Sequence, residues 1–181
     1  MDLHRPLSVI LTGSPGTGKS SLLAELKRRG HPVYHEIARE VILESQSKGS
    51  SLTPWEDLPG FTQDVMSKGV ERFVDLPKDT LTFMDRGLPD SIAYLHWGKQ
   101  DVLSRWRLWT QQYRYANTVF ICPPWEDIYS SDNQRKESFS ESLEIHKHMV
   151  NTYQELQYSL ISLPLTSVEE RANFIEEELS K

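Results

Sequence analysis

Residues 13–20 read Gly13-Ser14-Pro15-Gly16-Thr17-Gly18-Lys19-Ser20. This stretch fills every fixed position of the phosphate-binding pattern G-x-x-x-x-G-K-[ST]. Its glycines let successive backbone N–H groups turn toward one small volume, where triphosphate oxygens can bind. Lys19, which we expect to be exposed in the loop, can reach the β- and γ-phosphates, and the Ser20 hydroxyl can bind Mg²⁺. The sequence therefore predicts a nucleoside triphosphate site that extends from Gly13 to Ser21.

Both flanks of the loop fit this prediction. Residues 7–12 form a short apolar run, which is typical of a buried strand. Residues 19–29 predict a helix that ends at Gly30, with cationic side chains in its last turn. The loop thus joins a strand to a helix N-terminus, where an anion is stabilised.

The composition limits the classes of function. The chain has 181 residues and no internal linker, so we expect a single domain over residues 1–181. The net charge of −6 argues against a nucleic-acid partner, because such proteins usually carry a basic face. A single cysteine, Cys122, fits a cytoplasmic location, and no apolar stretch is long enough for membrane insertion. The sequence leaves the oligomeric state open.

Strand and helix patterns alternate along the chain. The strand-like segments are residues 7–12, 32–35, 81–84, 118–122 and 159–163. The helical segments lie near residues 19–29, 36–47, 61–76, 89–97, 100–115, 138–156 and 167–179. This alternation predicts an α/β fold, in which a parallel sheet carries helices on both faces.

The helix over residues 138–156 has the clearest amphipathic pattern. Its predicted apolar face contains Phe139, Leu143, His146, Val150 and Tyr153.

Charged residues follow the second and third predicted strands, where parallel sheets bind ligands. Glu36 and Arg39 could present a carboxylate and a guanidinium to a substrate, although an ordinary surface ion pair has the same spacing. Asp85 could hold Mg²⁺ through water or accept a proton from an attacking hydroxyl, and a turn residue is the alternative. Arg86 can bind phosphate or substrate through two hydrogen bonds. We interpret Asp90 as ordinary compensation of a helix dipole.

A polar segment follows the fourth predicted strand, near residues 124–138. It contains Arg135 and Lys136, and a lid that carries such cations could close over the triphosphate and exclude water. Arg135 is the candidate for stabilising charge on the phosphoryl group during transfer. The alternative is a solvated linker before the next helix.

Two other patterns have simpler interpretations. Residues 57–60 match the D-x-x-G of GTPases, but no apolar strand precedes them and the chain has no N-K-x-D, so we expect a turn. The five tryptophans are mostly core residues by composition, although some could line a pocket for a ring.

Four motifs together resemble a known family. They are the phosphate-binding loop, H-E-I-A-R-E at 35–40, D-R-G-L-P-D-S-I-A-Y at 85–94 and P-P-W-E-D-I-Y at 123–129. Over nearly its whole length the chain resembles the small P-loop ATPase/kinase family that includes the ribosylnicotinamide kinase domain of bifunctional NAD-biosynthesis regulators. The resemblance implies a kinase-type P-loop fold, with a five-stranded parallel sheet in the order 2-3-1-4-5, and it implies ATP with Mg²⁺.

The resemblance also implies roles for individual residues. Lys19, Ser20 and Asp85 would be catalytic or metal-side residues. The side chains that face the phosphoryl acceptor would be those of Glu36, Arg39 and Arg86.

Two functions follow from these patterns. The first is a kinase that transfers the γ-phosphoryl of ATP to a small hydroxyl-bearing acceptor, with a nucleoside as one candidate. The alternative is a binding module that hydrolyses a nucleoside triphosphate, or is switched by it, and acts on a protein or lipid partner.

Overall fold

Five parallel strands form one sheet in the order β2-β3-β1-β4-β5. The computed structural model describes residues 7–129 and 137–181. The strands are β1 (Ser8–Thr12), β2 (Val33–Tyr34), β3 (Thr82–Asp85), β4 (Thr118–Ile121) and β5 (Ser159–Ser162). The α/β fold and the strand order are therefore confirmed, and the phosphate-binding loop follows the central strand.

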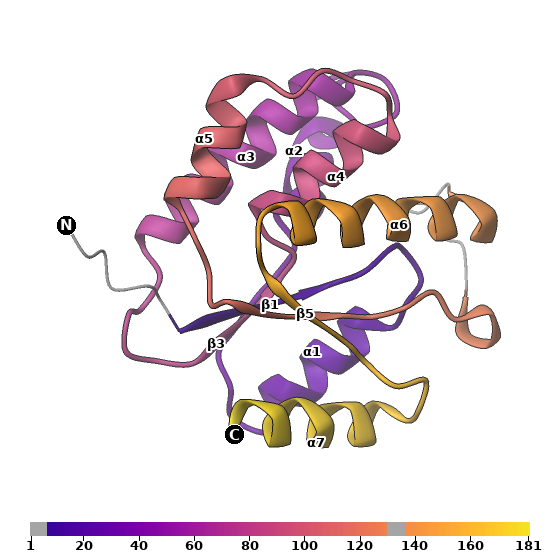
Figure 1. Cartoon of the computed structure of the whole chain (residues 1–181). Coiled ribbons are helices and arrows are strands. Elements are labelled where there is room, and N and C mark those ends of the chain that lie inside the picture. The colour runs from indigo at the N-terminus through magenta and orange to yellow at the C-terminus, as the bar shows by residue number, and fades with distance from the viewer. Residues whose placement is uncertain (1–6, 130–136) are drawn as a thin grey trace.

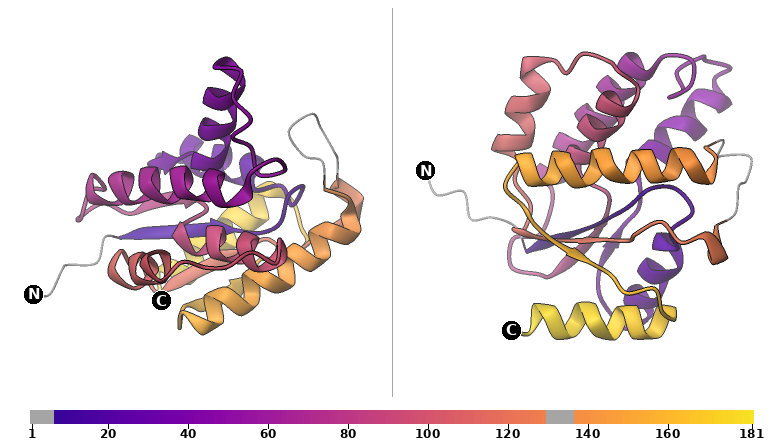
Figure 2. Two further views of the ribbon diagram at one scale, coloured as in Figure 1. Left: turned by 90° about the horizontal axis from the view of Figure 1, so that it is seen from above. Right: turned by 45° about the vertical axis from the view of Figure 1, so that its right-hand side comes forward.

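Helices cover both faces of the sheet. They are α1 (Lys19–Arg28), α2 (Ile37–Ser47), α3 (Leu58–Val74), α4 (Leu88–Trp97), α5 (Ser104–Gln112), α6 (Phe139–Glu155) and α7 (Val168–Leu179), with a short 3₁₀ turn, η1 (Glu126–Ile128). Figure 1 shows α1 and α7 on one face, while α4 and α6 lie on the other with α2, α3 and α5 beyond them. The right-hand view in Figure 2 shows the same layers.

Alternating side chains of the central strands divide the core between these layers. Val9 and Leu11 of β1 pack in a cluster with residues of α1 and α7, including Leu22 and Ile175. Ile10, between them, packs in a second cluster with residues of α4 and α6. Because side chains of a strand point alternately to its two faces, a strand covered on both faces carries a continuous apolar run, as Val9, Ile10 and Leu11 do in β1.

The buried face of α6 differs from the prediction. Tyr153 is buried, as predicted, together with Ser142, Ile145, Met149 and Thr152, whereas Leu143 is 41% exposed. The buried stripe is therefore rotated from the predicted face, and small polar side chains occupy two of its positions.

The start of α3 also differs from the prediction. The side chain of Asp57 accepts a hydrogen bond from the backbone N–H of Gly60 at 2.9 Å, and α3 begins at Leu58 rather than at residue 61. The D-x-x-G stretch is therefore a helix cap and first turn, not a separate turn.

Gly13 allows a close approach between the loop and β4. Its φ is +142°, and a Cβ at this position would lie 2.5 Å from the carbonyl oxygen of Cys122. The backbone around that oxygen is itself held, because the N–H of Cys122 donates to the carbonyl of Thr12 at 2.8 Å.

We therefore expect Gly13→Ala to destabilise the protein more than Gly30→Ala. Gly30 also has a positive φ, +98°, but a Cβ there would meet nothing within 4 Å. The control variant should lose about 1–2 kcal/mol from backbone strain alone, and Gly13→Ala roughly 3 kcal/mol or more from strain and the clash. Urea unfolding measures both values, and equal losses would show that the approach to Cys122 is not tight.

Candidate active site

A cleft of about 960 Å³ opens at the carboxyl edge of the sheet. Segments that follow all five strands contribute to its lining, namely residues 15–21, 35–39, 85–88, 125 and 166–168. The phosphate-binding loop forms one end, and residues of α2, α3 and α4 form the other. The structure thus brings Lys19, Ser20, Glu36, Arg39, Asp85 and Arg86 into one cleft.

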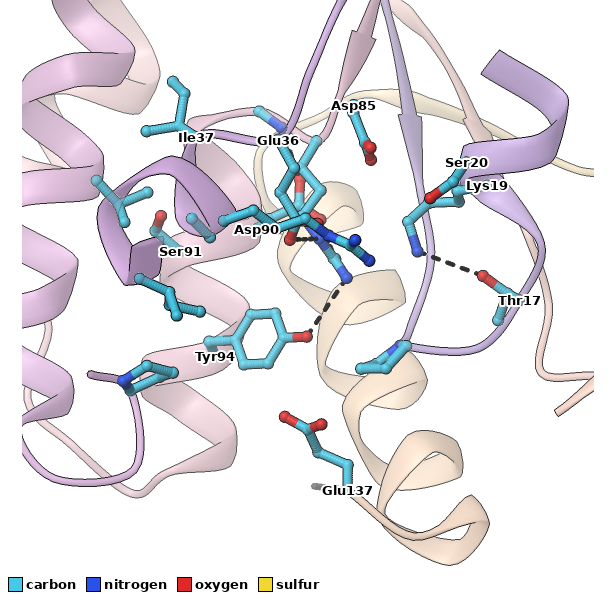
Figure 3. Close-up of a pocket in the computed structure, with 18 of the residues that line it drawn as sticks. Thr17, Lys19, Ser20, Glu36, Ile37, Asp85, Asp90, Ser91, Tyr94 and Glu137 are labelled. Atoms are coloured by element: carbon cyan, nitrogen blue, oxygen red, sulfur yellow. Dashed lines mark hydrogen bonds and ion pairs between the residues drawn. The ribbon is translucent and has the colours of Figure 1, made fainter. Parts of the chain in front are cut away.

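Lys19 is buried, contrary to the expectation that it is exposed. It is the first residue of α1 and only 7% exposed. Its ammonium donates hydrogen bonds to the carbonyls of Gly13 at 2.8 Å and Ser14 at 2.9 Å, and it lies 3.4 Å from the Thr17 hydroxyl (Figure 3). Burial, assisted by the charge of Arg86, lowers the pKa of Lys19 to about 8. An anion in the loop would compensate this buried charge.

Asp85 ends β3 with a carboxylate that is not saturated by the protein. The residue is 8% exposed, and its Oδ1 atom is buried without a hydrogen-bond partner in the structure as described. Burial and the nearby charge of Glu36 raise the pKa of Asp85. A buried polar atom without a partner is destabilising, so this oxygen is suited to a ligand, a proton or a metal-bound water.

The residues present fit a magnesium ion that arrives with a nucleotide. Ser20 is exposed at the start of α1, and Asp85, at the end of β3, supplies a spare carboxylate oxygen in the same cleft (Figure 3). Among residues 7–129 and 137–181, no three His, Cys, Asp or Glu side chains gather as a metal site. Mg²⁺ usually binds through one or two protein oxygens and the phosphates of its substrate, which agrees with this arrangement.

Glu36, which lines the same cleft as Asp85, forms ion pairs with two arginines. Its carboxylate accepts hydrogen bonds from Nε of Arg86 at 2.7 Å and from Nε of Arg39 at 3.1 Å. Burial opposes ionisation, but the charges of Arg86, Lys19 and Arg39 lower the pKa of Glu36. The Glu36–Arg39 ion pair, which was the alternative interpretation of their spacing, is thus present as part of a three-residue cluster in the cleft, and a substrate contact of these residues stays a prediction.

Asp90 has more contacts than a first-turn carboxylate needs, and our interpretation of it as dipole compensation was incomplete. It is 3% exposed and accepts a hydrogen bond from Arg86 at 3.1 Å. It also accepts from the backbone N–H of Gly87, the residue that precedes α4, at 2.9 Å.

Sequence reasoning also missed Arg171, in the last helix. This residue is 4% exposed, donates to the carbonyl of Thr17 at 3.2 Å, and lies with its guanidinium carbon 5.9 Å from the ring centre of Trp125. Arg171 lines the cleft at the end formed by the phosphate-binding loop. It lies in an acidic amphipathic helix, where no local sequence pattern indicates a contact with that loop.

The structure divides the tryptophans between core and cleft. Trp106 is buried in the core, whereas Trp55, Trp97 and Trp125 line the cleft. The candidate lid residues Arg135 and Lys136 lie outside the described residues, so the role of Arg135 stays a prediction.

A sequence model of the AAA domain family matches residues 8–171. The chain belongs to this family. The resemblance inferred from the motifs is therefore confirmed. No curated protein matches this AAA-domain chain.

Several solved structures share the fold at low sequence identity. A deoxyadenosine kinase from M. mycoides with bound dATP is 13% identical, with a TM-score of 0.61, and the match covers 96% of this chain and 100% of that one. A thymidylate kinase from Ehrlichia chaffeensis is also 13% identical, with a TM-score of 0.66 and coverage of 97% and 99%. The NadR protein in complex with NR is 17% identical, with a TM-score of 0.70, and the match covers 98% of this chain and 52% of that one.

These likenesses show the fold. The AAA-domain protein has the architecture of P-loop kinases, and it spans about half of the NadR protein. Within the described part of the chain, no helix has the length and apolar character that crossing a bilayer requires.

For Lys19 we expect Lys19→Met to weaken binding of Mg·ATP at least tenfold without destabilising the ligand-free protein. Binding should weaken because a charge-assisted hydrogen bond contributes about 1.5–3 kcal/mol. Stability should not fall, because methionine has a similar length and removes a buried charge from the ligand-free protein. Lys27→Met, on the exposed side of the same helix, is the matched control. Calorimetry and urea unfolding measure the two quantities, and unchanged affinity in Lys19→Met would contradict the assignment of the loop.

Proposed function

We propose that this AAA-domain protein is a Mg²⁺-dependent kinase that transfers the γ-phosphoryl of ATP to a hydroxyl of a small, unphosphorylated acceptor of the nucleoside class. The observation that carries the proposal is the position of Asp85. Its carboxylate oxygen Oδ1, which has no hydrogen-bond partner among the described residues, lies in the cleft between the phosphate-binding loop and Glu36 (Figure 3). A phosphoryl donor and an acceptor hydroxyl would meet at this carboxylate.

Each part of the site would have its own role in the reaction. Backbone N–H groups of residues 13–21 and the ammonium of Lys19 would hold the triphosphate. Ser20 and Asp85 would hold Mg²⁺, which supplies charge neutralisation on the phosphates when bound. Asp85 would also receive the proton of the acceptor hydroxyl, because both oxygens of Glu36 are already engaged by arginines.

Charge pairing in the cleft supports an acceptor without a phosphate. Arg86 is bonded to Glu36, Asp90 and Tyr94. Arg39 pairs with Glu36, and Arg72 with Glu40, so each of the three arginines in this part of the cleft has a carboxylate partner in the described structure. A phosphate on the acceptor would have to displace one of these ion pairs.

Aromatic side chains support an acceptor that contains a ring. The walls of this end of the cleft include Trp55, Phe61, Tyr94 and Trp97, which come from the segment before α3, from α3 and from α4. Such surfaces bind flat rings, while the hydroxyls of a sugar would face the charged cluster.

A panel of acceptors tests the substrate class. We expect nucleosides to stimulate ADP formation from Mg·ATP and to yield phosphorylated products detectable by mass spectrometry, whereas the matching 5′-monophosphates should not. The reverse preference would contradict the argument from paired arginines. Slow hydrolysis that no acceptor stimulates would favour the nucleotide-switched binding module instead.

Replacing Asp85 by Asn tests the proposed chemistry. The amide keeps the shape but cannot accept the proton, so we expect kcat to fall by roughly 10²–10⁴-fold, with little change in the Kd of the nucleotide. Asp79→Asn, an exposed carboxylate just before β3, should keep the activity of the unmodified protein. Turnover by Asp85→Asn within a factor of two or so of that control would remove Asp85 from the mechanism.

A further inference from the structure

Asp90 is a buried carboxylate that receives four hydrogen bonds from three parts of the fold. Oδ1 accepts from the Thr12 hydroxyl at 2.5 Å and from Arg86 at 3.1 Å. Oδ2 accepts from the Tyr153 hydroxyl at 2.5 Å and from the backbone N–H of Gly87 at 2.9 Å. These donors come from the end of β1, from α6 and from the turn between β3 and α4.

This degree of pairing exceeds what a helix cap requires. A first-turn carboxylate compensates the helix dipole while exposed to water, and one backbone N–H is enough to cap the helix. Asp90 is instead 3% exposed, and a buried charge is tolerated only with an ion partner and further hydrogen bonds. Its ion partner is Arg86, and the other three donors hold the carboxylate in place.

Arg86 needs support of this kind. Its φ is +70°, a left-handed conformation that is strained by about 1–2 kcal/mol for a residue with a side chain. Its guanidinium bonds Glu36 through Nε at 2.7 Å and Asp90 through Nη1 at 3.1 Å. The two carboxylates therefore hold the guanidinium between them, and strain of this kind persists only where the surroundings enforce it.

Of the side chains that donate to Asp90, Tyr153 is one that a ligand in the cleft would not touch. It is fully buried and does not line the cleft. Burial and the neighbouring Asp90 carboxylate raise the pKa of Tyr153, so its hydroxyl stays protonated and donates. Removing this hydroxyl deletes one hydrogen bond to Asp90 and leaves every side chain that lines the cleft in place.

We propose that Asp90, held by Tyr153, is a positioning residue that fixes the Arg86 guanidinium against Glu36 at the acceptor end of the cleft. The kinetic consequence rests on the proposed function. The structural consequence does not, because the orientation of Arg86 can be observed without any acceptor.

The first test follows the Arg86 side chain in Tyr153→Phe. In the unmodified protein, the Nε–H of Arg86 should give a slowly exchanging NMR signal, since it donates to Glu36 in a buried site; Arg86→Lys assigns the signal. We expect Tyr153→Phe to accelerate its exchange at least fivefold. The control is Tyr158→Phe, whose ring packs 5.5 Å from that of Tyr153 but whose hydroxyl is not one of the donors to Asp90 recorded within residues 7–129 and 137–181.

The second test separates binding of acceptor from binding of ATP. We expect Tyr153→Phe to raise the KM of the acceptor at least fivefold and to leave the Kd of Mg·ATP within twofold, while Tyr158→Phe changes neither. Asp90→Asn should reproduce the NMR effect more strongly, which keeps the test informative if one variant folds poorly. Unchanged exchange of the Arg86 Nε–H in both Asp90 and Tyr153 variants would overturn the proposal.

The two ideas fail in different ways. If no acceptor is phosphorylated by the unmodified protein, the proposed function is wrong, whereas faster exchange in Tyr153→Phe would still support the positioning role. If phosphorylation occurs and the acceptor KM is the same in Tyr153→Phe and Tyr158→Phe, the positioning role is wrong and the kinase assignment stands.

Discussion

The pairing of β1 with β3 is the constraint on which the site depends. Leu11 lies opposite Asp85 in this parallel ladder, and the N–H of Arg86 donates to the carbonyl of Leu11 at 3.1 Å. Parallel strands in this register end at the same edge of the sheet, so the phosphate-binding loop after β1 and the carboxylate at the end of β3 must be neighbours. A shift of one residue would point Asp85 to the other face of the sheet.

The cleft is built from ion pairs that exist before any ligand binds. Glu36 pairs with two arginines, Asp90 pairs with one of them, and Lys19 is held by backbone carbonyls. Breaking a buried pair costs about 3–5 kcal/mol, so these side chains do not reorganise freely. A preorganised site of this kind has already lost the conformational freedom that a flexible site would lose on binding.

Local sequence patterns predicted the features that depend on near neighbours. Three such features were correctly located: the phosphate-binding loop, the alternation of strands and helices, and the charged residues after β2 and β3. Each of them depends on the residue types at a few consecutive positions. Contacts across the chain were not predictable in this way. Asp90 meets Thr12 and Tyr153, which are 78 and 63 positions away, and Arg171 meets Thr17 at a separation of 154. The face of α6 was predicted in part: Tyr153 is buried as expected, but the buried stripe also contains Ser142 and Thr152, which are polar by type and buried by their context.

The contact between Arg171 and the carbonyl of Thr17 has a consequence for how the protein is made. The loop at residues 13–20 is synthesised before its partner in α7, 154 positions further along the chain, and α7 also contributes Ala172 and Ile175 to the core beside α1. At a synthesis rate of about 5–20 residues per second, the nascent loop waits on the order of ten seconds for this helix. During that interval α1 packs against the sheet alone and lacks the cover that Ala172 and Ile175 provide, so part of its apolar face stays open to solvent until α7 docks.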